Sequence, residues 1–206
     1  MSGFSLEQFV LRAWYKPSPW LKLLRPLSAL YAGIASRRRN AFLSDPSKVW
    51  TAPVPVIVVG NITLGGTGKT PMCIWLIDYL KARGLRPGLI SRGYGASRAG
   101  GFPHLIAPLM DQPGDVGDEP LLIARRCKVP VVIDPDRPAA ARHLLASAEG
   151  DVIISDDGLQ HYALGRDVEI LMIDASRGLG NARCLPEGPL REPVQRLDSV
   201  DLVVSN

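Results

Sequence analysis

The stretch that decides the fold is Gly60-Asn-Ile-Thr-Leu-Gly-Gly-Thr-Gly-Lys-Thr-Pro71, which follows the apolar run Val54-Pro-Val-Ile-Val-Val59. The apolar run is typical of a buried strand. Glycines at positions 65, 66 and 68 let the backbone curl until several N–H groups converge, and Lys69-Thr70 then begins a helix whose N-terminus favours an anion. A strand, a glycine-rich turn and a helix in this order predict a phosphate-binding loop in an α/β fold.

This loop is expected to hold a nucleotide through one contiguous set of residues. Lys69 would reach the outer phosphates, and the Thr70 hydroxyl would bind Mg²⁺. The common pattern GxxxxGK[ST] requires glycine where this chain has Thr63. A turn that only connects a strand to a helix is the alternative, but it gives no reason for the adjacent lysine and threonine at the helix start. The expected nucleotide-binding residues are Thr63, Leu64, Gly65, Gly66, Thr67, Gly68, Lys69 and Thr70.

Short β-branched runs alternate with longer helical patterns from residue 53 onward. Runs that are apolar on both faces are typical of buried parallel strands, and the alternation predicts βαβ units. Strands are expected at 54–60, 86–91, 129–134, 151–157, 168–174 and 201–205, and helices at 70–83, 118–127 and 137–148. The sequence therefore predicts a P-loop NTPase-like α/β fold with a mostly parallel sheet flanked by helices, in which 93–117 is a long loop.

The composition is that of a globular protein whose positive charge is concentrated at one end. Of the 206 residues, 46% are hydrophobic and 21% are charged. Residues 1–48 have a net charge of +6 and the whole chain has +4, so the remainder has −2. This local excess predicts an anionic partner for the N-terminal segment and argues against a nucleic-acid-coating protein. The three cysteines, at 73, 127 and 184, form no CxxC pair, which argues against disulfides and zinc.

The basic segment predicts an amphipathic helical arm, residues 1–48, that precedes a core domain, residues 49–206. Two helical pieces are expected within 5–43, separated at Lys16-Pro-Ser-Pro19. The longest stretch without charge, 26–36, has eleven residues. Since about 20 apolar residues are needed to cross a bilayer, the arm is not expected to span one.

The arm has two possible surroundings. Phe9, Trp14 and Trp20 lie with leucines on one side and basic residues around them, which is typical of a segment in the headgroup region of an anionic membrane. An amphipathic helix packed on the protein's own core fits the pattern about equally well. The apolar stripe is expected to consist of Leu21, Leu24, Leu27, Ser28, Tyr31 and Ile34.

Two adjacent carboxylates, Asp156 and Asp157, follow the run Val-Ile-Ile-Ser. Ligands of open parallel sheets bind beyond the carboxyl ends of the strands. A carboxylate there could hold Mg²⁺ directly or through water. A solvated turn, which Gly158 permits, is the alternative. The sequence predicts a magnesium site without indicating which aspartate binds the ion.

The tetrapeptide Gly117-Asp-Glu-Pro120 allows two interpretations. In the first, Asp118 caps a helix whose first turn contains the glutamate and the proline. In the second, Asp118 orients or deprotonates an acceptor hydroxyl, as an aspartate does in other phosphoryl transfers.

Histidines and arginines are further candidates. His161, in DGLQHY, could bind substrate, cap a loop or only pack. The other two histidines, His104 and His143, have no acidic or nucleophilic neighbours in the sequence and are expected to be surface or packing residues. The Gly/Pro-rich segment 177–193 contains three arginines that suit an anionic substrate, although a solvated basic loop is the more common case.

The motifs GNITLGGTGKTP, SRGYG, GDEP, ISDDGLQHY and GNARCLPEGPLREP, in this order after a basic amphipathic N-terminus, closely resemble those of the tetraacyldisaccharide 4′-kinases of lipid A biosynthesis. The resemblance covers essentially the whole chain, and DDGLQH with GPLREP is far more specific than the phosphate loop. It implies Mg²⁺-dependent transfer of the ATP γ-phosphate to the 4′-hydroxyl of a tetraacyldisaccharide 1-phosphate. It also implies a peripheral or monotopic protein at the cytoplasmic face of the bacterial inner membrane.

The resemblance implies roles for individual residues. Residues 63–70 would form the ATP loop, with Lys69 active in transfer, and Asp118 would be the catalytic aspartate. Asp156 and Asp157 would serve Mg²⁺. Because the acceptor is a lipid whose sugar head lies at the bilayer surface, residues 1–43 are expected to contact the anionic membrane. Contacts to the lipid A disaccharide precursor are expected from Asn61, Arg92, His161, Arg183 and Arg191.

Family members extend further and contribute a histidine that works with the catalytic aspartate. This chain ends at Asn206, directly after an apolar run, and is therefore expected to be a fragment with weak or no turnover. A membrane-associated nucleotide switch or metal-delivery GTPase is the alternative function, but such a protein should contain a base-reading [NT]KxD segment, which is not present in this sequence. A nucleic-acid-binding ATPase fits less well, because it would leave the apolar face of the arm unused.

Overall fold

The structure, a computed structural model, describes residues 6–96 and 101–206, with side chains from residue 10 onward. Its centre is a seven-stranded sheet in the order β3-β4-β2-β5-β1-β6-β7. All neighbouring strands are parallel except β3 and β4. The strands are β1 (Val56–Gly60), β2 (Pro87–Ser91), β3 (His104–Leu105), β4 (Val131–Ile133), β5 (Val152–Asp156), β6 (Val168–Ile173) and β7 (Leu202–Ser205).

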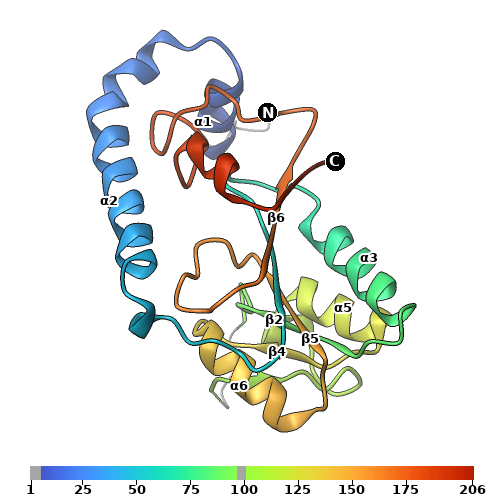
Figure 1. The fold of residues 1–206 in the computed structure, drawn as a ribbon. Helices are drawn as coiled ribbons and strands as arrows, with labels where there is room; N and C mark the ends of the chain where they lie inside the picture. The colour runs from blue at the N-terminus through green and yellow to red at the C-terminus, as the bar shows by residue number, and fades with distance from the viewer. Residues whose placement is uncertain (1–5, 97–100) are drawn as a thin grey trace, which may run out of the picture.

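Helices cover both faces of this sheet, because its central strands are apolar on both sides. On one face, α3 (Lys69–Lys81) and α5 (Asp118–Cys127) pack against alternate strand residues such as Val59 and Ile154. On the other face, α6 (Arg137–Ser147) packs on Val58 and its neighbours. The long α2 (Arg25–Leu43) runs along one side of the molecule and contributes to the second cluster (Figure 1). The predicted P-loop NTPase-like architecture is confirmed.

Two parts of the core differ from the sequence-based expectation. The predicted loop 93–117 contains the antiparallel edge strand β3 and the short α4 (Pro113–Val116), and residues 97–100 lie outside the described part. The strand predicted at 201–205 is parallel to β6, but it is not buried: Leu202 and Val203 are about half exposed. Apolar composition gave the strand correctly but could not distinguish an edge from the interior of the sheet.

The arm consists of α1 (Leu6–Tyr15), the 3₁₀ helix η1 (Pro19–Leu24) and α2. The break expected at 16–19 is therefore confirmed. α1 packs against the segment that follows β6, because the indole of Trp14 is buried and donates from Nε1 to the Pro186 carbonyl at 3.1 Å. The prediction that Trp14 belongs to a membrane-facing side was wrong, since this side chain lies inside a small apolar cluster. Phe9 belongs to α1, but its side chain lies outside the described part.

The apolar stripe expected along 21–34 is divided between two sides. Leu21 and Ser28 are buried, and the Ser28 hydroxyl donates to the Cys184 carbonyl at 2.7 Å. Another set on η1 and α2 is more than half exposed and repeats at helical intervals: Leu23, Leu27, Leu30 and Ile34. We call these four residues the exposed stripe. One side of the arm is therefore packed on the core, as one of the two alternatives expected, and the other side is open; contact of that side with a membrane stays a prediction.

Among the described residues, no helix has the length and apolarity required to cross a bilayer.

Candidate functional site

The phosphate loop connects the end of β1 to the start of α3. Gly65 and Gly68 have φ angles of 106° and 78°, which a residue with a side chain rarely adopts. Asn61 is fully buried and holds the loop from within, donating from Nδ2 to the Thr63 carbonyl at 2.9 Å. Its Oδ1 lies 3.3 Å from Lys69 Nζ. Asn61 therefore organises the loop from within and has no accessible surface in this structure, and its expected contact with the acceptor stays a prediction.

The outer side of the loop is extended rather than curled. Thr63 forms an antiparallel bridge with Leu190, and the Leu64 N–H donates to the Pro189 carbonyl at 2.9 Å. This pairing explains why position 63 need not be glycine. Beneath the loop, Arg177 donates from Nη2 to the Gly66 carbonyl.

Lys69 points toward the aspartate pair at the end of β5. Its Nζ lies 3.5 Å from Asp157 Oδ1, and Arg191 Nη1 lies 3.2 Å from Asp157 Oδ2. Burial raises the pKa of Asp157, but the two cations more than offset this, so its pKa lies below the ordinary value. Asp157 is therefore ionised and held between the phosphate loop and the segment 183–191.

Asp156 has the opposite environment. Its carboxylate is buried, with Ser91 Oγ at 3.5 Å and Cys73 Sγ at 3.8 Å. Burial, followed by the charges of Glu119 and Asp157, raises the pKa of Asp156 to about 6. The negative charges of Glu119 and Asp157 thus act on Asp156 and are opposed by Lys69 and Arg137, and a divalent ion at Asp156 would neutralise part of this negative charge.

The described residues contain no group of three His, Cys, Asp or Glu side chains that would hold a metal alone. This does not conflict with a magnesium site, since Mg²⁺ usually takes one or two carboxylates and completes its coordination with substrate phosphates and water. Asp156, Asp157 and the Thr70 hydroxyl are the donors that fit. Thr67 also has a buried hydroxyl that lacks a hydrogen-bond partner within the described part of the chain, which is consistent with a hydrogen bond to a bound ligand.

Arg137 is a functional candidate that the sequence reasoning missed. It is 1% exposed, and its guanidinium donates to the backbone carbonyls of Asp134 and Asp156, both at 2.9 Å. Burial lowers its pKa to about 10 despite nearby aspartates. A cation thus fixes the backbone directly before Asp157. The available signal was its position just after the strand predicted at 129–134, at the same edge of the sheet.

Arg92 lies close enough to His161 for its positive charge to act on the imidazole. Burial, then the charge of Arg137, lowers the pKa of His161 to about 4, and Arg92 contributes in the same direction. His161 is therefore neutral at physiological pH. Arg92, directly after β2, is exposed.

Asp118 begins α5 and is exposed, while Gly117, with φ 90°, is the cap residue. The capping interpretation of Asp118 is therefore not the structure observed. The next residue, Glu119, which the sequence reasoning did not single out, is close enough to raise the pKa of Asp156.

Two predicted residues lie elsewhere. Arg183 is exposed and lines a separate cavity of about 370 Å³ with Tyr15, Lys22 and other residues of the arm. It is not brought to Asp157. His104 was expected to have no acidic neighbour, but its Nε2 lies 2.6 Å from Asp111 Oδ2.

Three comparisons with known proteins agree. The family model described as LpxK, Tetraacyldisaccharide-1-P 4′-kinase, matches residues 20–206. Proteins named tetraacyldisaccharide 4′-kinase are 56% identical over 202 residues in Pseudomonas paraeruginosa and 57% identical over 198 residues in Pseudomonas syringae pv. syringae. These alignments cover 98% and 96% of this chain, and 60% and 59% of the relatives.

A solved structure is similar over most of the chain. LpxK from Aquifex aeolicus, crystallised in complex with ATP, has a TM-score of 0.80 and 34% identity. The alignment covers 91% of this chain and 59% of the Aquifex chain. The present chain therefore spans about 60% of the length of the curated relatives that it matches.

Proposed function

Because this chain belongs to the tetraacyldisaccharide-1-P 4′-kinase family, we propose that the protein containing it transfers the γ-phosphate of ATP to the 4′-hydroxyl of a tetraacyldisaccharide 1-phosphate. The observation that carries this proposal is the convergence of three segments at the carboxyl ends of β1 and β5. Lys69 comes from the phosphate loop, Asp157 from β5 and Arg191 from the segment 183–191. This arrangement combines a nucleotide side with an anion-binding side.

On the nucleotide side, backbone N–H groups of residues 65–70 would surround the triphosphate, and Lys69 would neutralise its outer phosphates. Release of Lys69 from Asp157 fits this role, since the phosphates would compete for the ammonium group. Asp156, Asp157 and Thr70 would hold Mg²⁺, which supplies charge neutralisation at the β and γ phosphates. The family and the ATP complex of the Aquifex relative support ATP as the nucleotide.

On the acceptor side, Asp118 is suited to orient or deprotonate the sugar hydroxyl. Its support is its exposed position at the start of α5, one residue before Glu119, whose charge raises the pKa of the buried Asp156. Neutral His161 can donate or accept a hydrogen bond with a sugar hydroxyl, and Arg191 can bind a negatively charged group. Arg92 is exposed near His161 and could approach a substrate phosphate.

The arm would hold the protein on an anionic membrane surface at the cytoplasmic face, where ATP is available. The exposed stripe supports this, because four large aliphatic side chains of η1 and α2 are more than half exposed in the described part of the chain. Arg37 and Arg38 lie on the same helix and are exposed, which suits anionic headgroups.

The test is transfer of ³²P from γ-labelled ATP to a tetraacyldisaccharide 1-phosphate in detergent micelles. The full-length protein should transfer label, and residues 1–206 alone should show weak or no turnover. A matched pair of acceptors, one with a free 4′-hydroxyl and one blocked at that oxygen, identifies the receiving atom.

Label on the blocked acceptor, or release of free phosphate with no labelled lipid, would contradict the proposed reaction. Nucleotide binding without transfer by the full-length protein would instead favour a nucleotide switch.

A further inference from the structure

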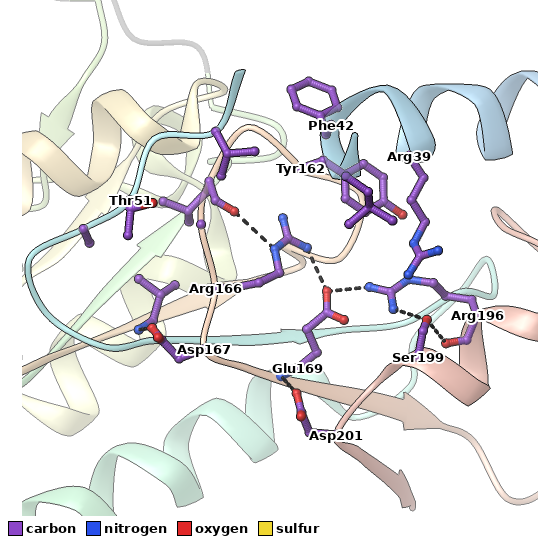
Figure 2. A pocket seen from close by; sticks show the side chains of 16 residues that line it. Arg39, Phe42, Thr51, Tyr162, Arg166, Asp167, Glu169, Arg196, Ser199 and Asp201 are labelled. Carbon is purple, nitrogen blue, oxygen red and sulfur yellow. Dashed lines mark hydrogen bonds and ion pairs between the residues drawn. The ribbon is translucent and has the colours of Figure 1, made fainter. Parts of the chain in front are cut away.

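A set of buried charges lies behind the acceptor side and has no part in the phosphoryl-transfer roles above. We call it the buried ion-pair chain: Arg166, Glu169, Arg196 and Glu192. Their side chains are 14%, 10%, 2% and 5% exposed. The first three line a cavity of about 510 Å³, and Figure 2 shows them linked in a row across its floor.

This cavity is not the nucleotide site. Val56 lines it and is the first residue of β1, whereas the phosphate loop follows Gly60, the last residue of that strand. Four residues of a strand extend about 13 Å. The buried ion-pair chain therefore acts on the site only through the segments that it holds.

The first of these segments is the loop between β5 and β6, which contains Asp157 and His161. Arg166 folds back on this loop and donates from Nη2 to the His161 carbonyl at 2.6 Å, from Nη1 to the Leu159 carbonyl at 3.0 Å, and from Nε to the Leu164 carbonyl at 3.2 Å. One planar guanidinium thus fixes three carbonyls of the loop. Only an arginine has enough donors in this geometry.

The second segment carries Arg191. Glu169 Oε1 accepts from Arg166 Nη1 at 2.9 Å and also from Arg196 Nη2. Arg196 Nε lies 3.2 Å from Glu192 Oε2, and the Tyr162 hydroxyl donates to the same oxygen at 2.6 Å. Glu192 directly follows the arginine that binds Asp157.

These contacts connect the two segments. Arg166 binds the His161 carbonyl and Glu169, Glu169 binds Arg196, and Arg196 binds Glu192. Glu192 is next to Arg191, which binds Asp157 in the first segment. The buried ion-pair chain, whose charges alternate in sign, thus joins the segment of His161 to the segment of Arg191, and both are proposed to contact the acceptor.

We propose that Arg166 and the buried ion-pair chain are positioning residues that set the spacing between His161 and the Arg191–Asp157 pair, and thereby the affinity for the sugar acceptor. This inference rests on the proposed kinase function. Stability alone is a poor explanation for such a chain, because buried ion pairs can often be replaced by apolar residues without loss of stability. A geometric role explains why the charges are retained and why one member reaches three carbonyls.

The test uses the full-length enzyme with Arg166→Lys, which keeps the positive charge but has only three donors on one atom for the three carbonyls and Glu169. The acceptor KM should rise at least about tenfold, since a misplacement of about 1 Å can cost about 100-fold. The ATP KM should change less than the acceptor KM, because Arg166 binds carbonyls of residues 159–164 and none of the phosphate loop. Hydrogen exchange should become faster in residues 158–165 and stay unchanged in α3.

Glu169→Gln is the second variant, because it keeps the side-chain shape and removes the charge that joins the two arginines. It should change the same quantities in the same direction. Arg83→Lys is the matched control, since Arg83 is exposed on the turn between α3 and β2. It should change none of them.

The proposal is overturned if both variants lower kcat or the melting temperature but leave the acceptor KM unchanged. It is also overturned if exchange in residues 158–165 is unaffected. Failure of the proposed function is a separate result, seen as no transfer by the wild-type enzyme, and the exchange comparison still decides the positioning role in that case.

Discussion

The nucleotide side and the acceptor side of this site are built in different ways. The phosphate loop of the nucleotide side is one contiguous segment, 60–70, whose glycines and helix start create the loop geometry locally. The proposed acceptor side combines pieces of 157–169 and 183–196 that are joined by ion pairs between residues distant in sequence. The comparison teaches that the geometry of the phosphate loop is determined by the local sequence, whereas the proposed acceptor side depends on side chains that the whole fold positions.

The change expected to have the largest effect removes the one side chain on which the nucleotide side depends. Lys69→Ala in the full-length protein should lower kcat about 1000-fold, because the charge that stabilises the transferring phosphate is lost. Steady-state ³²P transfer measures this. Lys48→Ala is the control, since Lys48 pairs with Asp45 at the surface. An effect below about tenfold would mean that the loop backbone suffices.

The second change tests whether the two sides act independently. Asp118→Ala should lower transfer about 100-fold or more by removing the group that acts on the acceptor hydroxyl. ATP affinity, measured by calorimetry, should stay nearly unchanged. Loss of ATP affinity with unchanged chemistry would assign Asp118 to the nucleotide side instead.

The third change concerns pH and the acceptor side. The folded-state pKa of His161, about 4, lies below its ordinary 6.5, so stability from the neutral form is complete above pH 6.5 and is lost as the pH falls toward 4. At pH 5 the free energy of unfolding is lowered by about 2 kcal/mol through this group. Urea unfolding at pH 7 and pH 5 should show that His161→Gln loses about 2 kcal/mol less than the wild type over this interval. Equal losses would mean that His161 is solvated.

The smallest expected effect lies outside both sides, on the membrane contact proposed for the arm. Replacing Leu27, Leu30 and Ile34 by serine should weaken binding to phosphatidylglycerol vesicles at least about tenfold. The melting temperature should barely change, because these side chains are exposed. Vesicle co-sedimentation with and without the substitutions measures the loss. Unchanged binding would leave the arm as a structural element alone.

The same contrast explains how much could be predicted. The sheet, its helices and the position of the glycine-rich loop between β1 and α3 were predicted well, because strand, helix and loop signals depend on neighbours in sequence. Glu119, Arg137 and Arg166 were not recognised, because their roles depend on partners that only the fold brings near. The prediction for Trp14 was wrong for a related reason. Helical periodicity shows that a helix has an apolar side, but it does not show what covers that side.

The strand order has a consequence for the time at which the protein becomes competent to bind. β1, which carries the phosphate loop, lies between β5 and β6, so Val56 pairs with Ile153 and Ile57 with Val168. A ribosome that has just completed β1 must add about 100 more residues before either neighbour exists, which takes about 5–20 s. Until then the loop has no sheet to hold it. Nucleotide binding by a nascent chain would therefore report that the centre of the sheet has closed.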